Sequence, residues 1–433
     1  MDIDSLYALY QRYPEICTDT RKITPGCIFF ALKGANFDGT TFASEALNQG
    51  AAYAVVSDPS LTGQQFIHAH DTLHTLQSLA HTHRRQLSIP LIAITGTNGK
   101  TTTKELVAKV LSEKYSVHAT KGNLNNHIGV PLTLLATPLN TEIIVCEMGA
   151  NHIGEIERLC EIAIPTHGII TNIGKAHLEG FGSIEGIQKA KGELFDYLRL
   201  HQGVAFINTD DPRLNNIGKD LSGAITYGFN ASSAPLVHFK YMHGNDGGFT
   251  IEDIESKQQI HSQMFGFYNA SNVLAAYTIG LHFNVPQEKM VKSLSSFIPG
   301  ANRSEVILHK GCRIIKDAYN ANPTSLTLAL QAFAQRFPEG WIVLGDMKEL
   351  GEESENAHQQ IIGLIAELGL KYVILVGKAF KSALENRPIK FSSLVTADDI
   401  DEVRAGWSWE KYQDQTLLLK GSRSMNLEKL LEP

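Results

Sequence analysis

The sequence of 433 residues lacks the features expected of secreted, membrane-spanning or nucleic-acid-binding proteins. Its five cysteines are odd in number and form no C-x-x-C pair, which predicts reduced structural thiols and neither disulfides nor a zinc site. No stretch reaches the roughly 18 apolar residues of a membrane span, and the acidic N-terminus has no signal-peptide core. Basic residues form no block, and the formal net charge is −7. We therefore expect a cytoplasmic monomer with no nucleic-acid partner and no stable membrane association.

The chain is too long for one hydrophobic core. A prior of roughly 150 residues per domain, together with 43% hydrophobic residues and no low-complexity tract, predicts about three packed domains. We interpret the polar run at 81–86 as a helix end and linker, and Pro299-Gly300 as a second boundary. The expected domains are residues 1–84, 85–300 and 301–433.

Short apolar runs that alternate with helical periods indicate an α/β fold with parallel sheets. The predicted buried strands of the middle domain are residues 89–95, 142–148, 167–173 and 203–209. Alternating residues between 228 and 267 predict a β-hairpin insertion around an Asn-Asp-Gly-Gly turn. A helix over 269–282 follows. The runs 339–347, 371–377 and 415–422, with a helix over 354–370, predict a second open α/β sheet.

A glycine-rich turn joins the first of these middle strands to a helix. Residues 94–103 read ITGTNGKTTT, and only two residues separate Gly96 from Gly99, two fewer than in the usual phosphate loop. Backbone N–H groups from Gly96 to Lys100, with the helix N-terminus, would hold phosphate oxygens. Lys100 would reach the outer phosphates and the Thr101 hydroxyl would bind Mg²⁺. The alternative is an ordinary glycine-rich strand-to-helix turn.

Glu147 ends the strand predicted at 142–148, so its carboxylate would face the same crevice as the glycine-rich loop. The functional interpretation is a second metal ligand. The alternative is a helix cap or a solvated strand end.

One lysine falls within an apolar helical stripe. Ile187, Leu194 and Leu198 share a helix face, and Lys191 lies between them. The side chain could extend its head to water. Alternatively, burial would lower its pKa and leave a nucleophilic amine that adds CO₂ to become a metal-binding carbamate. His177, just upstream, could supply an imidazole to the same ion.

Motifs along nearly the whole chain resemble those of the Mur ligases. They are GTNGKTTTKE, CEMGANHIGEI, TNIGKAHLEGFGS with KAKGELF, YNASNVLAA, KDAYNANPTSL, LGDMKELGEES and LLKGSRSMNLE, and the N-terminal stretch TDTRKITPGCIFFALKGANFDG is also similar. The segments DAYNANP and GDMKELGE indicate the branch that adds D-alanyl-D-alanine. The resemblance implies a small N-terminal α/β UDP-sugar-binding domain, a central P-loop ATPase domain with a parallel sheet and a β insertion, and a C-terminal Rossmann-like α/β domain.

The resemblance also implies an activity in peptidoglycan precursor synthesis. ATP would phosphorylate the terminal carboxylate of UDP-N-acetylmuramoyl-tripeptide, and the amine of D-alanyl-D-alanine would attack the acyl phosphate to give an amide, ADP and phosphate. A ligase that adds diaminopimelate or glutamate shares the ATP machinery and is the nearest rival. A P-loop switch, in which hydrolysis drives motion and no bond forms, is the rival from another class.

Roles carried over from the family are expectations for matching positions in this sequence. The catalytic residues would be Lys100, Lys191 and His177. ATP would contact Gly96, Thr97, Asn98, Gly99, Lys100, Thr101, Thr102, Asn269, Asn272, Arg303 and Asp317. Mg²⁺ would be held by Thr101, Glu147, His177 and carbamylated Lys191. The UDP-muramoyl substrate would meet Thr20, Arg21, Lys33, Asp38, Gly39, Asn123, Asn125 and Asn126, and the peptides Asn320, Asn322, Lys348, Glu349 and Ser422.

Two of these motifs also have purely structural interpretations. Asn269 in YNASN would serve as the N-cap of a helix, and DAYNANP would form a turn that ends before a helix.

Overall fold

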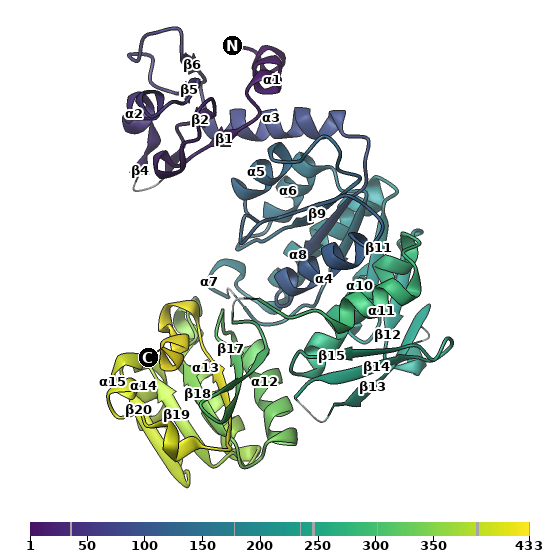
Figure 1. Cartoon of the computed structure of the whole chain (residues 1–433), viewed down its shortest axis with the longest axis vertical. Coiled ribbons are helices and arrows are strands. Elements are labelled where there is room, and N and C mark those ends of the chain that lie inside the picture. Colours follow the sequence, from purple (N-terminus) through teal and green to yellow (C-terminus); the bar gives the residue numbers. More distant parts are fainter. Residues whose placement is uncertain are drawn as a thin grey trace.

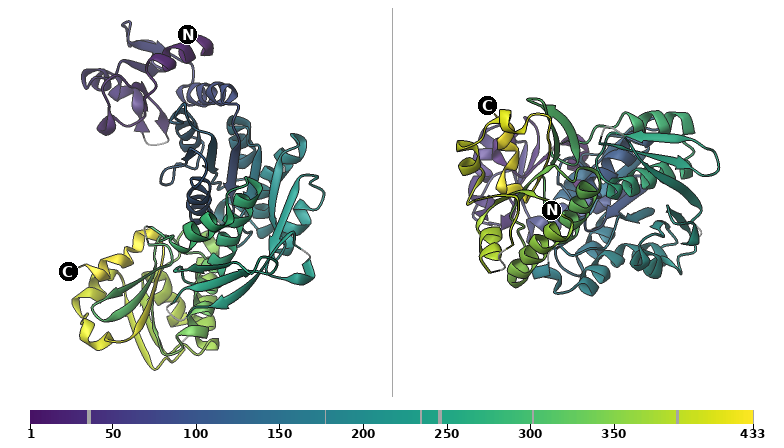
Figure 2. Two further views of the ribbon diagram at one scale, coloured as in Figure 1. Left: turned by 45° about the vertical axis from the view of Figure 1, so that its right-hand side comes forward. Right: turned by 90° about the horizontal axis from the view of Figure 1, so that it is seen from below.

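The computed structural model describes residues 1–34, 37–176, 178–233, 235–244, 247–300, 302–386 and 389–432. They form three domains, each built on its own β-sheet (Figure 1). The N-terminal and C-terminal domains lie at opposite ends of the molecule with the central domain between them, as the left view of Figure 2 also shows. The predicted three-domain α/β architecture is confirmed.

The N-terminal domain has a four-stranded parallel sheet in the order β1-β2-β5-β6. The strands are β1 (Ile16–Cys17), β2 (Ile28–Phe30), β5 (Tyr53–Val56) and β6 (Phe66–His68). A two-stranded ribbon, β3 (Lys33–Gly34) and β4 (Phe37–Asp38), projects from it. The helices are α1 (Ile3–Arg12), α2 (Ala43–Asn48) and α3 (Thr72–Gln86).

Helix α3 joins the N-terminal domain to the central one. It begins at an N-cap, Asp71, whose side chain accepts from the backbone N–H of His74, and it continues to Gln86. Leu76 and Leu79 pack in a hydrophobic cluster that also contains residues of the central domain. The polar run at 81–86 is therefore the end of this helix, as predicted, and its Arg84 contacts the central domain.

The central sheet has nine strands in the order β15-β14-β13-β12-β11-β10-β7-β9-β8. Strands β7 (Leu91–Thr95), β8 (Val117–Ala119), β9 (Ile143–Glu147), β10 (His167–Ile170), β11 (Val204–Asn208) and β12 (Ala224–Gly228) run parallel. Strand β13 (Val237–His243) pairs parallel with β12 and antiparallel with β14 (Phe249–Asp253), which pairs antiparallel with β15 (Gln259–Ser262). The four predicted middle strands and the β insertion are confirmed.

Helices cover both faces of this parallel sheet, which explains its unbroken apolar runs. Along β7, Ile92 and Ile94 face one hydrophobic cluster, whereas Leu91 and Ala93 face the other. The first cluster contains α4 (Lys100–Leu111), α10 (Phe267–His282) and α11 (Gln287–Ser295). The second contains α5 (Gly129–Leu135), α6 (Glu155–Ala163), α8 (Ile184–Leu200) and α9 (Pro212–Gly218).

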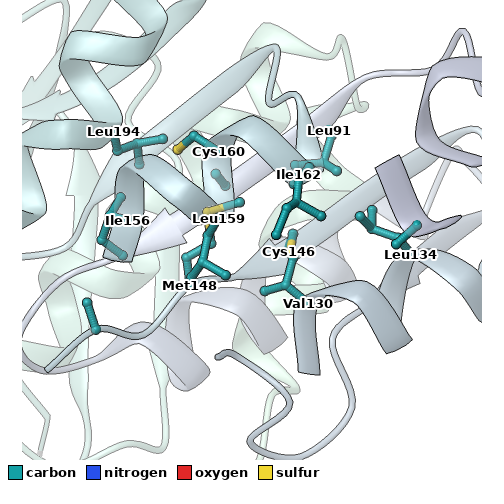
Figure 3. Close-up of a cluster of buried hydrophobic side chains, with 14 of the residues drawn as sticks. Leu91, Val130, Leu134, Cys146, Met148, Ile156, Leu159, Cys160, Ile162 and Leu194 are labelled. Carbon is teal, nitrogen blue, oxygen red and sulfur yellow. The ribbon is translucent and has the colours of Figure 1, made fainter. Parts of the chain in front are cut away.

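Figure 3 shows part of the second cluster, where Leu91 and Cys146 of the sheet gather with Val130, Leu134 and Leu159 of the covering helices. Each such side chain contributes about 1.5–3 kcal/mol when it is fully buried. This packing holds the carboxyl ends of β7 and β9 side by side.

The C-terminal domain has a six-stranded sheet in the order β16-β17-β21-β18-β19-β20. Strand β16 (Glu305–His309) is antiparallel to β17 (Cys312–Asp317), and the others, β18 (Trp341–Gly345), β19 (Tyr372–Val376), β20 (Ser393–Ala397) and β21 (Thr416–Lys420), are parallel. The helices are α12 (Pro323–Arg336), α13 (Ser354–Glu367), α14 (Lys378–Asn386) and α15 (Ile400–Ala405). This confirms the predicted second open α/β sheet.

All five cysteines are buried free thiols, as expected from their number and spacing. Burial raises the pKa of Cys146 to about 12. Within the described ranges, no helix is long and apolar enough to span a membrane.

Replacement of Arg84 tests the junction between the first two domains. Arg84 is 4% exposed and donates to four backbone oxygens, those of Leu87, Ile89, Ala163 and Ile164. Arg84→Ala leaves these acceptors unpaired, so we expect a loss of about 3 kcal/mol or more in the free energy of unfolding, measured by denaturant titration.

The neighbouring Arg85 is exposed, and Arg85→Ala serves as the matched control with an expected change within about 0.5 kcal/mol. Equal effects of the two substitutions would contradict the role assigned to Arg84.

Candidate functional site

The shortened phosphate loop passes through two glycine conformations between β7 and α4. Gly96 has φ 141° and Gly99, the N-cap of α4, has φ 79°. A Cβ atom at residue 96 would lie 2.0 Å from Oγ1 of Thr171, which directly follows β10. Only glycine combines this backbone angle with this close approach, so the first glycine serves the packing of the loop against β10.

Thr171 and Asn172, the two residues that follow β10, hold the loop in place. Asn172 accepts from the backbone N–H of Thr97 through its carbonyl oxygen, at 3.0 Å, and from that of Asn98 through Oδ1, also at 3.0 Å. The carbonyl oxygen of Asn98 accepts from Oγ1 of Thr171 at 2.6 Å and from Nδ2 of Asn172 at 2.9 Å. The sequence analysis assigned no role to Thr171 or Asn172, although their position at the carboxyl end of the strand predicted at 167–173 was a signal for one.

These bonds correct the prediction that every N–H group from Gly96 to Lys100 faces a phosphate. The N–H groups of Thr97 and Asn98 are directed to Asn172. The first N–H groups of α4 have no partner within the helix, and the helix dipole favours an anion there. The start of α4 at Lys100 to Thr102 is therefore the part of the loop that could hold an anion.

Lys100 folds back over the loop. Its Nζ donates to the carbonyl oxygens of Gly96, at 2.7 Å, and Thr97, at 3.1 Å. Burial lowers the pKa of Lys100, nearby Glu147 opposes this shift, and Arg303 adds to it. The Arg303 guanidinium itself lies 3.6 Å from the centre of the Tyr319 ring. The positive charge that acts on Lys100 therefore comes from another domain.

Glu147 is a buried carboxylate with one unpaired oxygen. Its side chain ends β9 at 1% exposure, and Oε1 accepts from Nδ2 of Asn125 at 2.7 Å. Oε2 has no hydrogen-bond partner among the described residues. Glu147 is therefore neither a solvated strand end nor a helix cap. A buried carboxylate oxygen without a hydrogen-bond partner is suited to bind a cation.

Lys191 is buried on α8, so its head does not extend to water. It is 3% exposed, Nζ donates to the carbonyl oxygen of Ala150 at 3.3 Å, and the Phe181 ring lies 5.2 Å away. Burial, followed by the positive charge of Lys100, lowers the pKa of Lys191 to about 7. The amine is thus substantially neutral and nucleophilic near pH 7. His177 lies outside the described residues.

No cluster of three or more His, Cys, Asp or Glu side chains is present in the described part of the chain. A cation near Glu147 would need other ligands. The half-buried Thr101 hydroxyl, on the first turn of α4, and an acid group formed on Lys191 are oxygen donors of the kind that Mg²⁺ prefers.

The two asparagines of α10 lie inside the helix, which begins at Phe267, and not at its N-cap, which is Gly266. Asn269 Nδ2 donates to the carbonyl oxygen of Phe265 at 2.8 Å, and Asn269 Oδ1 accepts from Nδ2 of Asn272 at 3.1 Å. Asn272 Oδ1 accepts from Oγ1 of Thr103 at 3.2 Å. The interpretation of Asn269 as a cap is wrong, and the pair instead ties α10 to α4.

The DAYNANP segment reaches the phosphate loop from the C-terminal domain. Asn322 is the N-cap of α12, which confirms the structural interpretation, but its Nδ2 also donates to Oδ1 of Asn98 at 2.7 Å. Asn320 is exposed. Asp317, at the end of β17, pairs with Lys420 at 2.6 Å.

The remaining C-terminal candidates lie where β18 and β21 end. Ser422 Oγ accepts from the N–H of Lys348 at 2.9 Å, and the ammonium of Lys348 lies 3.7 Å from Asp346. Glu349 has a φ of 63° and precedes Leu350 and the turn η4 (Gly351–Glu353). The structure brings these residues together at one edge of the C-terminal sheet.

The candidates in the N-terminal domain do not meet the phosphate loop. Arg21 pairs with Asp19 at 2.8 Å, and Lys33 pairs with Asp38 at 3.3 Å across the ribbon of β3 and β4. Thr20 lies in the same short helix as Arg21. At Gly39 a Cβ atom would lie 2.5 Å from the carbonyl oxygen of Leu32.

The three asparagines of the TKGNLNN loop make different contacts. Asn125 contacts Glu147, whereas Asn126 Oδ1 accepts from the N–H of Gly129 at 2.9 Å at the start of α5. Asn123 contributes its carbonyl oxygen to the N–H of Asn125, at 2.8 Å.

Comparison with known proteins gives consistent matches over the three domains. Family models match in chain order: Mur ligase family, catalytic domain, over residues 12–87; Mur ligase middle domain, over 94–280; and Mur ligase, glutamate ligase domain, over 302–423. The UDP-N-acetylmuramoyl-tripeptide--D-alanyl-D-alanine ligase of Bacillus subtilis (strain 168) is 36% identical over 432 residues, covering 96% of this chain and 92% of the relative. The ligase of the same name from Escherichia coli (strain K12) is 34% identical, with coverage of 96% and 92%.

Solved structures agree. A crystal structure of MurF from Acinetobacter baumannii has a TM-score of 0.86 and 32% identity, and the match covers 96% of this chain and 92% of that one. A structure of MurF ligase from Thermotoga maritima in complex with ADP has a TM-score of 0.83 and 27% identity, with 96% of both chains covered.

The lowered pKa of Lys191 predicts a pH-dependent effect of its removal. In the folded state the amine titrates at about pH 7, and in the unfolded state near 10.5. Below pH 7 both states are protonated and the full cost of the buried charge is present. As the pH rises from 7 to 10.5 the unfolded state holds the extra proton, so the cost falls. Lys191→Met should therefore raise stability at pH 6 by about 2 kcal/mol more than at pH 9.

Thermal unfolding in bicarbonate-free buffer at the two pH values measures this difference. Lys189 lies exposed on the same helix, so Lys189→Met is the matched control and should show no such pH dependence. An equal effect of Lys191→Met at pH 6 and pH 9 would contradict the burial of a titrating amine.

Proposed function

Because this chain belongs to the Mur ligase family, we propose that it joins D-alanyl-D-alanine to UDP-N-acetylmuramoyl-tripeptide in an ATP-dependent reaction of peptidoglycan precursor synthesis. Relatives that bear this ligase name match nearly the full length of the chain. One structural observation carries the proposal. Lys100 begins α4, the charges of Glu147 and Arg303 both act on its pKa, its own charge acts on the pKa of Lys191, and Oε2 of Glu147 has no hydrogen-bond partner among the described residues. This arrangement suits the transfer of a phosphoryl group.

The reaction needs ATP because a carboxylate is a poor acyl donor. In the first step a carboxylate oxygen of the tripeptide attacks the terminal phosphorus of ATP, and ADP leaves. In the second step the amine of D-alanyl-D-alanine attacks the carbonyl carbon of the acyl phosphate. The bond between that carbon and the phosphate oxygen breaks, phosphate leaves and the amine loses a proton. Phosphate is a far better leaving group than the oxide ion that direct attack would require.

The nucleotide would lie at the start of α4, between the central and C-terminal domains. Lys100 and the first N–H groups of α4 would hold the outer phosphates, and Arg303 would approach them from the C-terminal side. Asn269 and Asn272 lie in α10 beside the loop and are the proposed purine contacts. Asp317 is the proposed ribose contact, with one of its oxygens already bonded to Lys420.

Thr101, Glu147 and carbamylated Lys191 are the proposed holders of Mg²⁺, together with His177. When bound, Mg²⁺ would offset the charge of two anions that must meet. The orphaned oxygen of Glu147 and the neutralised amine of Lys191 support this assignment. Addition of CO₂ to the neutral amine forms an N–C bond, releases one proton and converts the amine into an anion. The orientation of Glu147 by Asn125 would keep one of its oxygens directed toward the ion.

The two peptide substrates would approach from opposite ends. Thr20, Arg21, Lys33, Asp38 and Gly39 are the proposed contacts of the UDP-sugar. Loop residues Asn123, Asn125 and Asn126 would lie near its muramoyl end, and the proposed contacts of D-alanyl-D-alanine are Asn320, Asn322, Lys348, Glu349 and Ser422. The domain boundaries after residues 84 and 300, the monomeric state and the cytoplasmic location remain predictions.

An amine panel tests the proposed substrate. The protein is incubated with ATP, Mg²⁺ and UDP-N-acetylmuramoyl-tripeptide, and separately with D-alanyl-D-alanine, meso-diaminopimelate or glutamate. We expect amide formation only with D-alanyl-D-alanine, measured by mass spectrometry together with ADP release. Amide with another amine alone would refute the substrate, and ADP release that needs no acceptor would favour a switch.

Replacement of Glu147 tests the metal assignment. Glu147→Gln keeps the bond to Asn125 available but removes the negative charge, so we expect the Mg²⁺ concentration for half-maximal rate to rise about tenfold or more. Direct Mn²⁺ binding by calorimetry, in the presence of ADP, should weaken in parallel. Glu142, exposed just before β9, is the matched control, and Glu142→Gln should leave both measurements unchanged. An unaltered metal requirement in Glu147→Gln would count against this ligand.

A further inference from the structure

A side-chain amide pair connects the phosphate loop to the C-terminal domain. Nδ2 of Asn322 donates to Oδ1 of Asn98 at 2.7 Å, and Nδ2 of Asn98 lies 3.5 Å from Oδ1 of Asn322. The backbone of Asn98 is held on both its N–H and its carbonyl by the residues after β10. The Asn98 side chain is therefore presented from a fixed point, and its partner belongs to a different domain.

A second contact lies beside the pair. Oγ1 of Thr324, on the first turn of α12, accepts from the N–H of Lys175 at 2.8 Å. At the adjacent Gly174 a Cβ atom would lie 2.8 Å from Oγ1 of Thr324, so the approach requires a residue without a side chain. Oγ1 of Thr97 bonds both the N–H and the carbonyl of Gly174. The phosphate loop and segment 171–175 thus form one hydrogen-bonded unit against which α12 begins.

A third contact joins the same two domains farther along. A Cβ atom at Gly351, which begins η4, would lie 3.5 Å from Cβ of Glu179 in α7 (Leu178–Phe181). The last residue of α7 is Phe181, whose ring lies near the Lys191 amine. Gly351 follows the motif that carries Lys348. The contact between the C-terminal and central domains therefore brings two features together. One is the proposed amine-binding motif, and the other is α7, whose Phe181 lies against Lys191.

We propose that Asn98 and Asn322 are positioning residues that couple the seating of the C-terminal domain to the phosphate loop. The inference rests on the proposed function, because it concerns the order of the two steps. With the pair formed, the amine-binding domain is in place when the acyl phosphate forms, and the amine reaches the carbonyl carbon before water does. Without it, water attacks the same carbon, which regenerates the carboxylate and releases phosphate, so ATP is consumed without an amide.

The chemistry of the pair suits such a reversible contact. Each amide is both donor and acceptor, so the two side chains satisfy each other without a charge. One such hydrogen bond contributes about 0.5–1.5 kcal/mol, which is small enough to break when the domains separate. The buried ion pair between Asp317 and Lys420 lies within the C-terminal domain and does not cross the junction.

The test separates the pairing of Asn322 from its role as a helix cap. Serine also caps helices but is too short to reach Asn98, so Asn322→Ser removes the pair and keeps the cap. Asn98→Ala removes the pair from the other side. The measurements are kcat, KM for ATP, and the amount of ADP released per amide formed. Gln331→Ala, an exposed change on the same helix, is the control and should match wild type.

We expect each single variant to lose about fivefold to tenfold in kcat for amide formation. ADP released per amide should rise above one, while KM for ATP changes less than kcat. The double variant should be no worse than the worse single variant, because both changes break one contact. A ratio of one in both single variants, or losses that multiply in the double variant, would overturn the coupling. Absence of amide in wild type would instead refute the proposed function.

Discussion

The candidate site depends on the hydrogen bonds that Thr171 and Asn172, just after β10, make with the phosphate loop. Two residues fewer than usual leave the loop without enough chain to wrap a phosphate by itself, and Asn172 takes up the N–H groups of its middle. The N–H groups left without a partner within the protein's own helix are those at the start of α4. A helix N-terminus supplies unpaired N–H groups and a favourable dipole, so this is where an anion could bind.

Several buried charges surround this point, and each is costly to the folded state on its own. Lys100 is satisfied by loop carbonyls, Lys191 by one carbonyl, and Glu147 by one amide on one oxygen only. The incomplete pairing of Glu147 is the feature that a purely structural site would not keep. These charged side chains lack some of their hydrogen-bond partners and lie beside a helix N-terminus that could bind an anion. They are therefore suited to a ligand that supplies the missing partners.

The two domain junctions differ in physical character. The N-terminal domain shares a continuous apolar core with the central one through α3, and Arg84 fastens the end of that helix. The C-terminal domain meets the phosphate loop through amide, hydroxyl and backbone contacts. Apolar burial favours a fixed junction, whereas single polar contacts exchange readily with water. The C-terminal junction also has an apolar part, because Phe265 of the central domain packs in the hydrophobic cluster of the C-terminal domain.

Local pattern in the sequence determined the parallel strands, the glycine loop before α4 and the place of Lys191 on an apolar helix face, because periodicity and turn chemistry act over neighbouring residues. Whether the Lys191 ammonium reaches water was left open and was decided by the fold. The sequence did not reveal that α10 begins before Asn269, or that Asn172 and Asn322 hold the phosphate loop. The contacts of Asn98 with Asn172 and Asn322 join residues about 75 and more than 200 positions apart. Tertiary structure decided these contacts. A short polar side chain can cap a helix, bind another residue or face solvent, and the choice depends on which partner the fold places within hydrogen-bond distance.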